Sequence, residues 1–115
     1  AITDAAPDPI FAKDRSGTML MANRATLWAI GHPAEDVLGK SDAEWLHDQP
    51  ERAEAIIAND QRIIATGVAE VVEERLHTPV GERIFSASKA PLRNSAGEVV
   101  GLVGISRDVT AQRAA

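Results

Sequence analysis

Few residues of this 115-residue sequence have the types and spacing that catalysis requires. Ser86 and Ser88 share a face of a predicted strand, but no histidine accompanies them in a nucleophile motif. Glu73 and Glu74 are adjacent in another predicted strand, so their side chains point to opposite faces and cannot act as a carboxylate pair. The sequence therefore predicts that this chain is not itself an enzyme.

The sequence also lacks a recognisable metal or phosphate site. His32, His47 and His77 have no metal-ligand spacing, such as two histidines four residues apart on a helix, and we interpret each as a surface or structural residue. The segment 101–104, with glycine at both ends, falls inside a predicted strand and not at a strand-to-helix turn that could bind phosphate. There is no cysteine, which excludes disulfides and thiolate chemistry.

Composition limits the class of protein. With 44% hydrophobic residues and a net charge of −5, the chain is expected to form one soluble domain. It has no cluster of lysine and arginine and few aromatic residues, so we expect no nucleic-acid partner. No run approaches the roughly 18 apolar residues of a membrane helix, so we expect no membrane partner and a cytoplasmic location. Because the sequence begins without Met, we expect a module of a longer protein.

The elements that must position any site alternate between two groups of strands and a central group of helices. Short strands are expected at 10–13 and 18–22, around a turn at 14–17. Three short helical segments follow, with Asn23 as a helix cap and a Ser41–Glu44 capping box, and then one long helix that ends near residue 66. A strand returns at 68–78, and two more strands joined by a tight turn lie within 82–110. This order predicts an α+β domain with one antiparallel sheet and helices on one face.

The last hairpin, with its turn at 94–97, is the most informative stretch. Its second strand is apolar at both odd and even positions from Val99 to Ile105. A strand with one face in water should alternate, so this strand should be covered on both faces. One face requires the core, and the other requires another segment or another molecule.

Several segments, taken together and in order, resemble the PAS domains of bacterial sensor kinases and cyclic-di-nucleotide signalling proteins. They are Pro9-Ile10-Phe11-Ala12-Lys13-Asp14, Gly17, Asn23, Gly39-Lys40-Ser41-Asp42, Ser88-Lys89-Ala90-Pro91-Leu92-Arg93, and 101–110 ending in Arg107-Asp108-Val109-Thr110. The resemblance implies a PAS fold with a five-stranded antiparallel sheet in the order 2-1-5-4-3. Residues 1–8 would end an N-terminal helix or linker, 9–110 would form the core, and 111–115 would begin a C-terminal signalling helix.

By this resemblance, a pocket would lie between the long helix and the inner face of the sheet. The candidate pocket residues are Trp28, Trp45, Ile57, Asp60, Ile64, Phe85, Ala87, Leu102 and Ser106. For Asp60 the alternative is a solvated position at the border of the apolar helix stripe. For Trp28 and Trp45 the alternative is plain core.

The same resemblance turns Lys89 toward the interior. A buried ammonium group requires a carboxylate, and Asp42 is the predicted partner. The alternative is a lysine that reaches solvent from the edge of the sheet.

The outer face would carry Val99, Gly101, Val103 and Ile105. We expect Val103 and Ile105 to meet a partner, so a homodimer is expected through the outer sheet face or the N-terminal helix. Asp108 and Thr110 would form the junction to the protein's own output domain.

The known cofactors of the family can be tested against the residues. A covalent flavin adduct and a cysteine-linked chromophore both require a cysteine, so both are excluded. Haem-binding members use an axial histidine, commonly on the long helix, and no histidine stands there. The cofactor stays unknown, with a small organic ligand, a carboxylic acid or an empty interior all open. The resemblance thus implies a sensory module of a signal-transduction protein, such as a histidine kinase or a diguanylate cyclase. The alternative is a ligand-free dimerisation and relay module.

Overall fold

The computed structural model describes residues 2–114, so predictions for Ala1 and Ala115 lie outside the described residues. The helices are α1 (Ile2–Ala5), α2 (Arg24–Ile30), α3 (Ala34–Val37), α4 (Asp42–Trp45), α5 (Pro50–Thr66) and α6 (Thr110–Ala114). The strands are β1 (Ile10–Asp14), β2 (Met19–Ala22), β3 (Glu70–Thr78), β4 (Gly81–Arg93) and β5 (Val99–Asp108).

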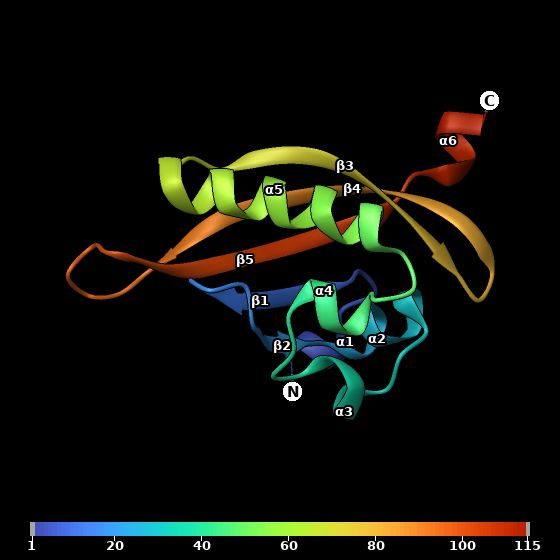
Figure 1. The fold of residues 1–115 in the computed structure, drawn as a ribbon, viewed down its shortest axis with the longest axis horizontal. Helices are drawn as coiled ribbons and strands as arrows, with labels where there is room; N and C mark the ends of the chain where they lie inside the picture. The colour runs from blue at the N-terminus through green and yellow to red at the C-terminus, as the bar shows by residue number, and fades with distance from the viewer. Residues whose placement is uncertain (1, 115) are drawn as a thin grey trace.

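The five strands form one antiparallel sheet in the order β2-β1-β5-β4-β3, as predicted. The first and last strands of the chain meet at its centre, where Phe11 pairs with Gly104 and Lys13 pairs with Leu102. The long β4–β5 hairpin extends beyond the rest of the molecule (Figure 1). Helix α5 lies along β3, β4 and β5, while α2, α3 and α4 gather near β1 and β2 (Figure 1).

Local signals fix where the helices begin and end. Asn23 caps α2 by accepting a hydrogen bond from the amide of Thr26, and Gly31 ends the helix in the left-handed conformation. Ser41 and Glu44 form the predicted capping box of α4. Helix α5 has proline in its first turn and ends at Gly67, again with positive φ. These caps hold the helices at the positions from which they cover the sheet.

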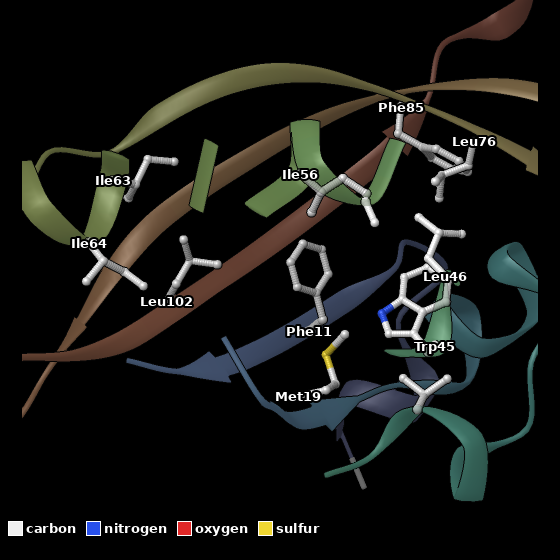
Figure 2. Packing of buried hydrophobic residues seen from close by; sticks show 12 residues of the cluster. Phe11, Met19, Trp45, Leu46, Ile56, Ile63, Ile64, Leu76, Phe85 and Leu102 are labelled. Carbon is white, nitrogen blue, oxygen red and sulfur yellow. The ribbon is translucent and has the colours of Figure 1, made fainter. Parts of the chain in front are cut away.

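The core fills the space between the inner face of the sheet and the helices. At one end Ile63 and Ile64 of α5 pack over Leu102, and at the other end Trp45, Leu46, Leu76 and Phe85 come together (Figure 2). Phe11 and Ile56 lie between these two groups (Figure 2). Burying each such side chain stabilises the fold by about 1.5–3 kcal/mol.

One orientation predicted for β5 is wrong. Val99 packs against the core and does not point to the outer face. The pairing passes from Leu92–Gly101 to Arg93–Val99, so Val100 is an unpaired extra residue in a bulge. The bulge reverses the alternation, while Val103 and Ile105 beyond it keep the predicted outward orientation.

The outer face of the sheet carries a row of paired residues, Ile10, Ile105, Ser88 and Val71. Val71 is 71% exposed and Ile105 is 48% exposed. Helix α1 does not lie over this face. Helix α1 lies beside α2, where Asp4 accepts a hydrogen bond from the amide of Arg24. Among the described residues, no helix is long and apolar enough to span a membrane.

Candidate functional site

Two lysine side chains enter the interior from the sheet. Lys13 on β1 and Lys89 on β4 are 2% and 1% exposed. Both belong to the inward-facing positions of their strands, because Lys13 shares the face of Phe11 and Lys89 shares the face of Ala87. A buried ammonium group is tolerated only with charged or hydrogen-bonding partners, so the residues around these lysines determine whether the fold is stable.

Asp60, near the middle of α5, binds both lysines. Its Oδ2 accepts a hydrogen bond from Lys13 Nζ at 2.5 Å and its Oδ1 accepts one from Lys89 Nζ at 2.6 Å. The side chain is buried, so the expectation of a solvated residue at the border of the stripe is wrong. Asp60, which interrupts the apolar stripe of α5, thus places its carboxylate between Lys13 and Lys89.

Two further carboxylates complete the group. Asp42 on α4 accepts from Lys13 Nζ at 2.8 Å through Oδ2, and from the indole nitrogen of Trp45 at 2.9 Å through Oδ1. Glu74 on β3 accepts from Lys89 Nζ at 2.6 Å and from the Asn59 side chain at 3.2 Å, both through Oε2. We call Lys13, Asp42, Asp60, Glu74 and Lys89 the ion network.

The ring of Phe11 lies against both lysines of the ion network. The Nζ atoms of Lys13 and Lys89 stand 5.5 and 5.8 Å from its centroid. The ring reaches this position because it pairs with Gly104, where a Cβ atom would come within 2.4 Å of the ring. Gly104 in the central strand therefore leaves room for the Phe11 ring beside the ion network.

The network keeps Lys13 charged. Burial alone would lower the pKa of Lys13, but the charges of Asp42 and Asp60 and their hydrogen bonds raise it by more. The net result is that the pKa of Lys13 lies above its ordinary value of 10.5. The ammonium form is thus the one that the folded protein prefers at neutral pH.

A cavity of about 60 Å³ adjoins the network. Lys13, Asp42 and Glu74 contribute to its wall, and most of the rest is apolar. The other lining residues are Pro9, Phe11, Met19, Thr26, Ala29, Ile30, Trp45, Ile56, Leu76, Phe85 and Ser106. An apolar cavity with a few converging polar groups is the usual form of a small-molecule site.

The candidate pocket residues fall into four groups. Trp45, Phe85 and Ser106 line the cavity. Asp60, Ile64, Ala87 and Leu102 are buried nearby without lining it, and Ile57 is half-buried outside it. The prediction for Trp28 is wrong, because its side chain is 74% exposed. Helix α2 turns Ala29 and Ile30 toward the cavity, which leaves Trp28 on its solvent side.

The predicted pairing of Lys89 with Asp42 is also wrong. Lys89 is buried and paired, but with Asp60 and Glu74, while Asp42 pairs with Lys13. Strand β5 lies between β4 and β1, so the strand of Lys89 is two strand spacings, about 10 Å, from the strand of Lys13. The lysine of the nearer strand therefore takes the carboxylate of α4.

Lys13 and Glu74 were not among the predicted site residues. Lys13 follows Phe11 by two positions, so strand alternation alone could have identified it as inward-facing once Phe11 was assigned to the core. Glu74 carried no such signal, because charged residues occupy both faces of β3.

The C-terminal junction is held by Asp108 and Thr110. Asp108 Oδ1 accepts hydrogen bonds from the hydroxyl of Thr110 at 2.6 Å and from its amide at 3.0 Å. The Thr110 hydroxyl in turn accepts from the amide of Ile84 at 2.9 Å, which ties α6 to β4. Partial burial raises the pKa of Asp108, but these bonds and the charge of Arg83, 3.7 Å away, hold it below its ordinary value. Arg113 of α6 also pairs with Glu73 on the outer side of β3.

Comparison with known proteins places this arrangement in a family. The family model described as "PAS fold" matches residues 3–114. The chain is 38% identical over 104 residues to a diguanylate cyclase of Vibrio cholerae, covering 88% of this chain and 32% of that protein. It is 34% identical over 110 residues to the methanogenesis regulatory histidine kinase FilI of Methanothrix harundinacea, covering 95% of this chain and 12% of the relative. The chain thus spans a third or less of these signalling proteins.

Solved structures give the same fold. The PAS domain of Bordetella pertussis BvgS has a TM-score of 0.82 at 26% identity, covering 98% of this chain and 86% of that one. A complex of Vibrio cholerae VqmA with ligand and DNA has a TM-score of 0.83 at 26% identity, covering 94% of this chain and 48% of that one.

The VqmA complex corrects the expectation of no nucleic-acid partner, because a protein with a closely similar domain is solved bound to DNA. The acidic charge of 115 residues describes only this segment, and the matched segment is about half of the DNA-bound chain. The sheet order, the inward-facing site and the match over nearly the whole sequence agree: the chain belongs to the PAS fold family.

Proposed function

We propose that this PAS domain is the signal-input module of a longer signal-transduction protein and that it binds a small molecule in the cavity beside the ion network. The module has no catalytic role, and the enzymatic activity of the parent protein, a histidine kinase or a diguanylate cyclase, resides in other segments. Relatives of both types support this assignment.

The observation that carries the proposal is the unpaired hydroxyl of Ser106. This residue is only 7% exposed and lines the cavity, yet within residues 2–114 no hydrogen bond engages its Oγ. A hydroxyl that lines a cavity and bonds to no side chain or backbone group keeps its donor and acceptor capacity for a ligand atom. A solved structure of VqmA bound to DPO, which has the same fold, supports ligand binding by such a domain.

The proposed route from cavity to output is short. Ser106 stands on β5 two residues before Asp108, whose hydrogen bonds hold the start of α6. A ligand that shifts β5 at Ser106 would change the geometry at Asp108, and α6 would carry that change into the output domain. The location is the cytoplasm, where such output domains meet their substrates.

Native mass spectrometry of the protein purified from its source tests the proposal. We expect a bound molecule that is lost on denaturation and that raises the unfolding temperature when added back. In the Ser106→Val variant, which fills the hydroxyl position with a methyl group, we expect weaker retention. Two results together would contradict ligand sensing: the purified protein carries no bound molecule, and no fraction of a cell extract changes its unfolding temperature.

The second candidate is a ligand-free dimerisation and relay module. It is favoured by the small volume of the cavity and by the exposed apolar residues Val71 and Ile105 on the outer face. In that case signalling should survive Ser106→Val and be lost in Ile105→Asp.

A further inference from the structure

The formal charges of the ion network do not balance. Asp42, Asp60 and Glu74 contribute three negative charges, and Lys13 and Lys89 contribute two positive charges. Within the part of the chain that the structure describes, no arginine or histidine bonds to these carboxylates, and the one further charge-neutral donor to Glu74 is Asn59. The ion network thus carries one excess negative formal charge, and Glu74, its least buried member, is half-buried.

The excess charge can be located at Glu74. Both oxygens of Asp60 accept from lysines, and both oxygens of Asp42 accept from Lys13 or Trp45. Glu74 receives both of its hydrogen bonds on Oε2, and no donor among residues 2–114 reaches its Oε1. Glu74 and Ser106 both line the cavity, so the side chain with free acceptor capacity and the side chain with the unpaired hydroxyl share one space.

From this geometry we propose that the cavity receives the positively charged N–H end of a small organic ligand, an ammonium or amidinium group, and rejects carboxylates. The inference rests on the proposed sensory function and specifies the chemistry of its ligand. The ligand's N–H group donates to Glu74 Oε1 and to Ser106 Oγ, and its positive charge cancels the excess. A carboxylate placed there would add a second negative charge beside the half-buried Glu74, and like charges at close range repel. The apolar wall around Ile30, Leu76 and Phe85 accommodates the carbon part of the ligand.

The size of the cavity limits the probe. An apolar cavity of about 150 Å³ holds the six carbons of benzene, so about 60 Å³ corresponds to about two or three non-hydrogen atoms. Formamidinium, formamide and formate each have three non-hydrogen atoms and nearly the same shape, and they differ in charge. Titrating each into the 115-residue chain at pH 7 and constant ionic strength separates charge from size.

The reporter is built into the site. The Trp45 indole N–H donates to Asp42 beside the cavity, whereas Trp28 is exposed, so two indole signals in proton–nitrogen NMR spectra serve as probe and internal reference. We expect formamidinium to shift the Trp45 signal saturably, with formamide weaker and formate weaker than formamidinium by at least tenfold. The Trp28 signal should stay fixed. Binding of formate as tight as that of formamidinium would overturn the proposal.

A matched pair of variants assigns the preference to one side chain. Glu74→Gln keeps the shape and removes the excess charge, and we expect it to reduce the preference for formamidinium over formate at least tenfold. Glu73→Gln removes the same charge one residue away on the outer face, where Glu73 pairs with Arg113, and should change the preference less than twofold. The wild-type comparison needs neither variant, so a folding defect in Glu74→Gln leaves the proposal testable.

The outcomes separate this inference from the function on which it rests. If the probes bind at Trp45 without preferring positive charge, the ligand chemistry is wrong while the cavity remains a binding site. If no probe moves the Trp45 signal at concentrations up to about 100 mM, both the ligand chemistry and sensing through this cavity are wrong.

Discussion

At the scale of single residues, Asp60 is the carboxylate of the ion network that pairs with both lysines. Its two oxygens bind lysines from β1 and β4, and its side chain is almost wholly enclosed. Removing its charge leaves both ammonium groups short of a partner in a medium where a free charge is costly. Asp60 thus contributes to stability mainly by preventing the two buried ammonium groups from lacking a partner.

We predict that Asp60→Asn lowers the free energy of unfolding by about 3–5 kcal/mol, the range for breaking a buried ion pair. Urea denaturation followed by circular dichroism measures this change. Glu70→Gln is the control, because it removes a carboxylate from the exposed pair with Arg62 and should have little effect. Equal effects of the two substitutions would show that burial does not strengthen the dependence on Asp60.

Lys13 gives a dependence on alkaline pH. Its folded-state pKa is raised above the ordinary 10.5, so folding favours the protonated form. The stabilisation is therefore fully present below pH 10.5 and is lost as pH rises through the folded-state value. We expect the free energy of unfolding to fall in that alkaline range, by less in Lys13→Met than in wild type. The exposed Lys40→Met variant should fall as wild type does.

The sequence predicted the orientation of a single residue well where one rule determined it. It predicted poorly which residue would pair with another. The resemblance to PAS domains identified Lys89 as inward-facing, and the cost of burying its charge requires a carboxylate. Which carboxylate it meets depends on how α4 and α5 lie over the sheet, which no local pattern encodes. Trp28 and Trp45 show the same limit, since both are helical tryptophans and only one faces the core.

At the scale of elements, the central strand β5 controls how closely its neighbours approach. Gly101 and Gly104 leave room for the backbone of Lys13 and for the ring of Phe11. The hairpin was predictable from its turn residues, and so were the helix caps. The bulge at Val100 was not predictable. No residue there requires a bulge, and the apolar sequence is compatible with either register.

Gly104→Ala tests the role of this close approach. A Cβ atom would lie 2.4 Å from the Phe11 ring, so the ring must move away from its place beside Lys13 and Lys89. We expect a loss of about 1–3 kcal/mol, typical of overpacking. Val103→Ala, on the opposite face of the same strand, is the control for strand propensity. A fully wild-type urea midpoint in Gly104→Ala would show that the ring relaxes freely.

At the scale of the whole molecule, Ser106 at the cavity wall, Asp108 and helix α6 follow one another along a single segment. The family, the sheet order and the α+β class were all predictable, because many weak sequence signals agree along the chain. The cavity was predictable only as a location, since its volume depends on how side chains from eight different elements pack.

We predict that Asp108→Ala leaves the fold intact but uncouples output from input in the full-length protein. The substitution removes the acceptor for the hydroxyl and amide of Thr110, so the start of α6 loses its fixed position. The ratio of output activity with and without stimulus measures coupling. Asp14→Ala, which breaks a similar turn at Ser16 and Thr18 far from the junction, should retain regulation. Retained regulation in Asp108→Ala would rule out this exit.

Because Asp60 of α5 pairs with lysines from two strands, it also affects which parts of the protein unfold together in local opening. If α5 detached alone, Asp60 would leave Lys13 and Lys89 unpaired in a partly dry interior, so partial opening carries nearly the cost of full unfolding. Amide hydrogen exchange should therefore find the middle turns of α5 opening together with β1 and β4, as one cooperative unit. Helices α1 and α3, which have no residue in the network, should exchange through separate and cheaper openings.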